Sequence, residues 1–396
     1  MLRVFAAVLV LVSAVSPVDA QRGAREPRRP RLTAGADTND ANAYLQFGQR
    51  TIETNAGAAA DAFYWASRLD PSSADAYYGR RTATLMRRAS TFKGYMEGVR
   101  RTVFSDEMRA NDSLYFHALQ LDPFLHARFE RILIQQYFRT AIGDGINAGQ
   151  IDFYVERQLQ AAPPGVQAGY EAASGRFVLA LDLYTTALRS ERAPTRYYVE
   201  RARVNALQGL AAEAIVDYQT ALQKMRAQDA RTDTVVIFYS SKALHEYSIA
   251  LLHARRNAID SARAALGRAL EEDLAFYPAH VELAQLALRA RDTTTAMSEM
   301  SIAAELAPAS GHAQFQYGDF LVSVGRFADA IPVLRKAIEL EPYYANAYRS
   351  LGTALDRTGD AAGAREAYGK FLAAAARNHP QRAAVQSRLG ALGGGN

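Results

Sequence analysis

Apolar residues recur along this chain at the spacing of one helix face, and the helices that they predict come in pairs. One predicted helix carries its stripe at i, i+3, i+4 and i+7, through Tyr348, Leu351, Gly352 and Leu355. A second stripe follows at helical spacing, through Ala364, Tyr368, Phe371 and Leu372. Between them, Gly359 can adopt the positive φ that often ends a helix. The pattern predicts a helix, a tight turn and a second helix that packs back on the first.

This helix pair is repeated with a fixed period. Three sets of residues are each spaced by 34: Ala262, Ala296, Ala330 and Ala364; Ala250, Ala284, Gly318 and Gly352; Ala269, Ala303, Ala337 and Phe371. Most of these residues are small, which lets neighbouring helices approach closely. A period of this length is typical of a helix–turn–helix unit that stacks on its neighbours and buries a shared core with them.

The units resemble tetratricopeptide repeats. The better ones have an aromatic or Leu-Gly pair, a Gly turn, an Ala, an aromatic residue, an Ala-Leu or similar pair and then a Pro, and the best match spans 311–342. In the unit at 277–308, Arg291 and Asp292 replace the turn glycine. The resemblance implies an all-α fold, a right-handed superhelical solenoid of antiparallel helix pairs, with about eight to nine units and a C-terminal capping helix. It also implies a scaffold that binds a protein or peptide.

The same pattern divides the chain into segments. We expect a signal peptide at residues 1–20 and a disordered basic linker at 21–42. Degenerate units are expected at 43–163, with an inserted amphipathic helix near 91–104 whose stripe runs from Phe92 to Val103. Regular units are expected at 164–194, 195–228, 242–276, 277–308, 311–342 and 345–378, and a capping helix with a flexible tail at 379–396. The inserted helix either packs on the solenoid or binds a partner.

The first twenty residues have the three parts of an export signal. Arg3 gives a positive start, residues 4–15 form an apolar run, and Val18-Asp19-Ala20 is a small-residue cleavage site. The run is short for a transmembrane helix. We therefore expect cleavage after Ala20 and a periplasmic or secreted protein. An N-terminal anchor that is not cleaved is the alternative.

Most of the positive charge lies in the predicted linker. The formal net charge is +5, and residues 21–32 hold five arginines against one glutamate. The remainder of the chain is close to neutral, which does not suit a nucleic-acid-binding surface, so no nucleic-acid partner is expected. The chain has no cysteine and therefore neither a disulfide framework nor a thiolate metal site.

The sequence carries no recognisable catalytic or metal-binding motif. The seven histidines are scattered, and His245-Glu246 lacks the second histidine that a zinc-binding helix needs. No nucleophile elbow, phosphate-binding loop or calcium loop occurs. We therefore predict no enzyme activity, no cofactor and no metal site.

Partner binding is expected on the concave face, which the first helix of each unit would form. Positions predicted to point outward from these helices are Val199, Arg203, Tyr247, Leu251, Arg255, Val281, Gln285, Phe315, Asp319, Arg349 and Asp356. Their mixture of apolar and charged side chains suits a peptide or a helix. The alternative function is an envelope-assembly or polysaccharide-export helper of the same architecture. The sequence leaves the partner and the oligomeric state open.

Overall fold

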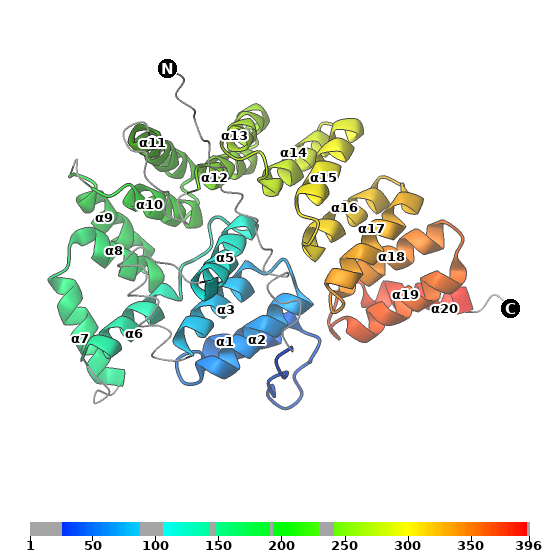
Figure 1. Cartoon of the computed structure of the whole chain (residues 1–396), viewed down its shortest axis with the longest axis horizontal. Coiled ribbons are helices and arrows are strands. Elements are labelled where there is room, and N and C mark those ends of the chain that lie inside the picture. The colour runs from blue at the N-terminus through cyan, green and yellow to red at the C-terminus, as the bar shows by residue number, and fades with distance from the viewer. Residues whose placement is uncertain (1–25, 88–105, 143–147, 191–192, 230–240, 394–396) are drawn as a thin grey trace, which may run out of the picture.

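The computed structural model describes residues 26–87, 106–142, 148–190, 193–229 and 241–393 (Figure 1). Within these ranges the chain forms nineteen helices and no strand, which confirms the predicted all-α fold. None of these helices is both long and apolar enough to span a membrane. Two predicted segments lie outside the described residues: the signal peptide at 1–20 and the inserted helix near 91–104.

Helices pair in the order of the sequence, and each pair packs on the next. The first five pairs are α1 (Ala41–Thr51) with α2 (Ala56–Leu69), α3 (Ala74–Met86) with α5 (Asp106–Leu121), α6 (Glu130–Ile142) with α7 (Ala148–Gln160), α8 (Pro164–Ala173) with α9 (Phe177–Ala187), and α10 (Arg196–Leu207) with α11 (Ala211–Asp229). The next four are α12 (Lys242–Arg255) with α13 (Ile259–Glu272), α14 (Tyr277–Arg289) with α15 (Thr293–Leu306), α16 (Gly311–Ser323) with α17 (Phe327–Leu340), and α18 (Ala345–Arg357) with α19 (Ala361–Ala374). The last described helix, α20 (Arg382–Gly393), packs against α19. The predicted solenoid of helix pairs with a C-terminal cap is therefore confirmed.

The turn inside each regular pair uses the same backbone conformation. Residues with positive φ lie at this turn in six units: Gly175, Gly209, Asn257, Arg291, Gly325 and Gly359. Arg291 takes a φ of 61° although it has a side chain, a conformation that costs an L-residue about 1–2 kcal/mol. The turn geometry is thus kept even in the two units where Asn257 or Arg291 replaces the glycine.

Small residues allow the two helices of a pair to touch, as the sequence indicated. A Cβ added to Gly318 would lie 2.6 Å from Leu334, and one added to Gly352 would lie 2.6 Å from the ring of Tyr368. Ala330 and Ala364 are fully buried on the facing helices. The contact surfaces of these helices leave no room for a larger side chain.

The solenoid curves until its two ends meet. In Figure 1 the helix pairs follow one another around the molecule, and α17 and α18 come to lie beside α2. Arg68 at the end of α2 donates to the carbonyl oxygen of Leu340 at 3.3 Å. The rings of Trp65 and Tyr343 meet edge to face, with their centroids 5.0 Å apart. The molecule is therefore a closed curve in which the first repeat contacts the last ones.

Residues 26–40 form part of this closure, so the prediction of a disordered linker is wrong for them. The indole Nε1 of Trp65 donates to the carbonyl oxygen of Pro27 at 3.0 Å. The guanidinium of Arg29 lies 4.3 Å above the Trp65 ring, and Leu32 packs against the same cluster. The prediction relied on the lack of apolar residues to bury, but an arginine can stack on an aromatic ring and keep its charge.

Candidate partner-binding surface

The centre of the curve holds the helix α5, which faces the first helices of later pairs (Figure 1). Arg203 of α10 donates to the hydroxyl of Tyr115 of α5 at 3.5 Å. At the end of α12, the guanidinium of Arg255 lies 4.4 Å above the ring of Phe124, which follows α5. We call the surface formed by Val199, Arg203, Leu251 and Arg255 the inner face.

The inner face also has an apolar component. Val199 and Leu251 are half-buried and pack against one continuous core cluster, which includes Leu119 and Phe124 from the N-terminal repeats. Tyr115 packs against the same cluster. Of these four predicted residues, Arg203 and Arg255 contact another segment of the same chain, and Val199 and Leu251 pack against the shared core.

The apolar rung, formed by Tyr247, Val281 and Phe315, does not point outward, and the prediction that it would is wrong. These side chains are only 6%, 6% and 9% exposed. The Tyr247 ring meets Phe276 with centroids 5.4 Å apart, and the Phe315 ring meets Tyr344 at 4.8 Å.

Both partners of the apolar rung precede the first helix of the next unit by one residue. That residue folds over the rung and covers it. The rung is therefore a contact between successive repeats, which helical spacing inside a single unit cannot reveal.

Three other predicted residues are half-buried on α14, α16 and α18. Arg349 donates to the carboxylate of Asp319 at 3.2 Å, and the hydroxyl of Ser350 donates to the same oxygen at 2.5 Å. Gln285 is also half-buried. Arg349 and Asp319 form a polar bridge between neighbouring first helices.

Asp356 does not contact these residues but pairs with the capping helix. Arg388 of the capping helix α20 donates to both of its carboxylate oxygens, at 2.6 and 2.7 Å. This hydrogen bonding, opposed by partial burial, lowers the pKa of Asp356 below its usual value. The bidentate pair fastens the cap to α18, so the carboxylate is already occupied.

The sequence patterns missed the side chains that the N-terminal repeats bring to the centre. Besides Tyr115 and Phe124, they include His117 of α5, whose ring packs edge to face on Tyr77 at 4.6 Å. Burial, together with the nearby His312 of α16, lowers the pKa of His117 to about 4. These residues belong to an irregular unit, and no periodic signal in the sequence marks them.

Comparison with known proteins agrees with this architecture. Residues 321–389 match the family model described as tetratricopeptide repeat, which covers the end of α16 to α20. This segment is therefore made of tetratricopeptide repeats. No relative was found among curated proteins.

Solved structures of tetratricopeptide-repeat (TPR) proteins are similar to parts of the chain. One is YrrB, described as a TPR protein with an unusual peptide-binding site; it has 18% identity and a TM-score of 0.39, and the match covers 52% of this chain and 98% of YrrB. Another is MamA, with 18% identity and a TM-score of 0.37, where the match covers 45% of this chain and 90% of MamA.

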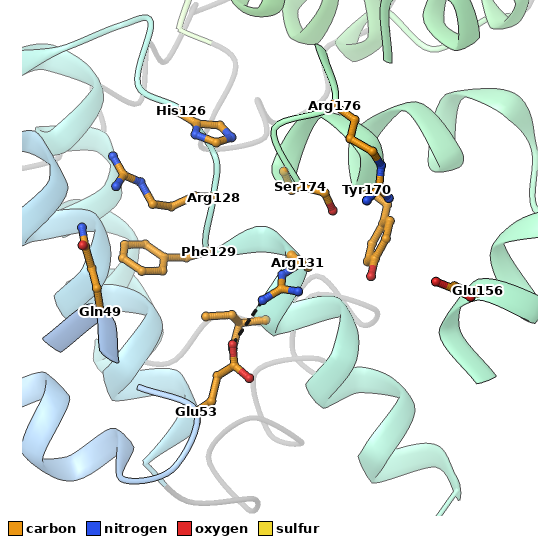
Figure 2. A pocket seen from close by; sticks show the side chains of 12 residues that line it. Gln49, Glu53, His126, Arg128, Phe129, Arg131, Glu156, Tyr170, Ser174 and Arg176 are labelled. Atoms are coloured by element: carbon orange, nitrogen blue, oxygen red, sulfur yellow. Dashed lines mark hydrogen bonds and ion pairs between the residues drawn. The ribbon is translucent and has the colours of Figure 1, made fainter. Parts of the chain in front are cut away.

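A hollow lies between the first repeat and the units around α6, α7 and α8 (Figure 2). Three arginines line it, and each has an acidic partner. Arg131 faces Glu53 at 3.3 Å, as Figure 2 shows, Arg128 donates to Asp75 at 2.8 Å, and Arg176 pairs with Glu171. The positive charges in this hollow are thus neutralised, and it is a weaker candidate for ligand binding than the inner face.

One buried carboxylate in the regular TPR units is also paired. Glu246 is 2% exposed, and its carboxylate accepts from Arg226 at 2.9 Å and from Arg268 at 3.0 Å. Its neighbour His245 stacks on Tyr218 with ring centroids 5.6 Å apart. Among the residues that the structure describes, no group of three or more His, Asp or Glu side chains is placed to hold a metal ion.

Proposed function

We propose that the chain is a non-enzymatic TPR scaffold that binds a protein or peptide partner on its inner face, outside the cytoplasm. The observation that supports this most directly is the pair of contacts at Arg203 and Arg255. These two arginines already hold a tyrosine hydroxyl and a phenylalanine ring from another segment of the chain. A surface with that chemistry suits aromatic side chains of a partner, and arginine and aromatic residues are frequent hot spots of binding.

The proposed location follows from the N-terminal sequence. Arg3, the apolar run at residues 4–15 and Val18-Asp19-Ala20 have the order of a cleavable export signal. Mass spectrometry of the protein from its native cell should give a chain that starts at Gln21. A soluble cytoplasmic fraction that yields residues 1–20 intact would contradict this location.

The test of the binding surface is charge reversal on the inner face. Mature protein carrying Arg203→Glu and Arg255→Glu would be used to capture partners from an envelope extract. We expect capture at least about tenfold weaker than for the wild-type protein, a loss above about 1.4 kcal/mol. The reason is that a partner would need the two guanidinium groups.

The control replaces two exposed arginines of second helices, Arg335→Glu and Arg365→Glu, and should leave capture unchanged. Circular dichroism would show that all variants keep their helices. Equal or stronger capture by the inner-face variant would remove this surface as the binding site. Capture of a polysaccharide in place of a protein would favour the alternative function as an export helper.

A further inference from the structure

The ends of the solenoid are joined by a compact group of side chains. We call Glu26, Arg29, Trp65, Arg68, Glu341 and Tyr343 the clasp. The hydroxyl of Tyr343 donates to Glu26 at 2.8 Å. Trp65 packs against Tyr343 as described above, and it is only 4% exposed. Arg29 lies 5.5 Å above the Tyr343 ring, on which Arg68 also packs at 5.7 Å.

A buried ion pair anchors the clasp. Arg68 donates to the carboxylate of Glu341 at 2.5 Å, and Glu341 is 3% exposed. Burial raises the pKa of Glu341 to about 7, although Arg68 opposes the shift. Such a pair is strongly tied to the closed arrangement, because removing one partner leaves the other charged and buried.

A second set of contacts lies beside the clasp. Asn39 donates from its side chain to the carbonyl oxygen of Ala373 at 2.7 Å. The backbone N–H of Arg377 donates to the carboxylate of Asp37 at 2.5 Å, and its guanidinium donates to the carbonyl oxygen of Gly35 at 2.7 Å. Residues 35–39 therefore lie along the end of α19, and both sets of contacts join the same two ends of the chain.

Closure of the curve and occupation of the inner face occur in the same structure. In a solenoid each unit packs mainly on its neighbours in sequence, so contacts between the two ends are separate from the core of each unit. The end contacts join the first repeat to the last ones, and the neighbouring repeat carries α5. The shared core cluster also links these N-terminal repeats to the later ones. In the closed form, Tyr115 contacts the half-buried Arg203, and the Phe124 ring lies under the guanidinium of Arg255, which is otherwise exposed.

We propose that the clasp controls access to the inner face, and that its release admits a partner helix which presents tyrosine and phenylalanine side chains as the segment at residues 106–125 does. This inference rests on the proposed function, since it concerns the partner of the same surface. The internal segment defines the chemistry of that partner, because the Tyr115 hydroxyl and the Phe124 ring are the groups that contact Arg203 and Arg255.

The test uses a locked and an opened form of the full mature chain. Because the chain has no cysteine, Asp37→Cys with Arg377→Cys allows selective locking by a short bis-maleimide. Arg68→Ala with Tyr343→Ala and Arg377→Ala would remove contacts from both sets without altering a helix-pair core. A matched control, Tyr154→Ala with Arg157→Ala, removes the same residue types from α7, where both are exposed.

The probe is a fluorescent peptide of residues 106–125. We expect the opened chain to have a larger radius of gyration in X-ray scattering than the wild-type and control chains. It should bind the peptide at least about tenfold more tightly than the locked chain does, and Tyr115→Ala with Phe124→Ala in the peptide should abolish binding. Equal peptide affinity of the locked and opened chains would overturn the proposal. So would equal radii of gyration for opened and wild-type chains.

The two proposals can fail separately. An envelope partner captured equally by the locked and opened chains would leave the binding function intact and exclude control by the clasp. Peptide binding that depends on the clasp, with no partner recovered from any extract, would keep the clasp and exclude the binding function. Helical circular dichroism of each form would show whether it folds. If the opened chain does not fold, peptide binding is compared between the locked and the wild-type chains.

Discussion

The close packing inside a TPR unit leads to a quantitative prediction for Gly352. This residue lies on α18, where an added Cβ would be 2.6 Å from Cδ1 and Cε1 of Tyr368 and 3.1 Å from Cγ. Tyr368 is buried, and its hydroxyl is 3.4 Å from Thr353. The ring cannot swing away without disturbing the contact between α18 and α19. Gly352→Ala should therefore strain this contact.

The matched control is Gly369→Ala on α19 in the same unit. Nothing lies within 4 Å of the Cβ that it would add. Both substitutions gain about 0.5–1 kcal/mol, because glycine is unfavourable inside a helix. Only Gly352→Ala also incurs overpacking, which costs about 1–3 kcal/mol. We expect the two variants to differ in stability by about 1–3 kcal/mol, with Gly369→Ala more stable than the wild-type protein.

The assay must report on this unit, because repeat proteins can unfold in parts. Hydrogen exchange of the α18 and α19 amides would give the local free energy of opening. Thermal unfolding followed by circular dichroism would rank the overall stabilities of the variants and the wild-type protein. If both variants protect α18 equally, or if Gly352→Ala is the more stable one, the small residues are not required for close helix approach.

Other substitutions test the turn, the apolar rung and a buried histidine. Arg291→Gly should stabilise the protein by about 1 kcal/mol in urea unfolding by relieving a positive φ; a loss of stability would show that the Arg291 side chain matters more than its backbone. Tyr247→Ser and Phe315→Ser should each lower the free energy of unfolding by about 3–5 kcal/mol. An unchanged melting temperature would show that these side chains are exposed. Burial lowers the pKa of His245 to about 3. Below about pH 6.5 the unfolded chain therefore binds a proton that the folded chain does not. As the pH decreases further, the free energy of unfolding decreases by about 1.4 kcal/mol per pH unit. In urea unfolding between pH 7 and 5, His245→Phe should show a shallower fall than the wild-type protein, and identical slopes would contradict a neutral buried His245.

The architecture could be predicted because its determinants are local and repeated. Ala330 and Gly352 recur at a fixed spacing as a consequence of helix contact, and Gly325 and Gly359 recur because one turn is used many times. Each signal appears in several units, so the period is visible even where a unit departs from it, as at Arg291. Sequence reasoning succeeds where one physical requirement is repeated.

The inner face could be predicted only in part. Arg203 and Arg255 both contact the segment at and after α5, but the apolar rung is covered by Phe276 and Tyr344 of following units. Helical spacing gives the direction of a side chain within a unit, not what the next unit places over it. The clasp involves single residues such as Trp65 and Tyr343, which have no periodic signal and meet only because the solenoid curves.

Closure of the curve has a consequence for how the chain folds. Most helix contacts join neighbours in sequence, and such local contacts form quickly, whereas the hydrogen bond between Arg377 and Gly35 joins residues 342 positions apart. The entropy lost in bringing two distant segments together grows with the length of chain between them, so this joint should form after the repeats that it connects. Each unit could then be complete while the circle is still open. The state of the joint would report whether both ends of a single chain are present and correctly folded, which no individual repeat can do.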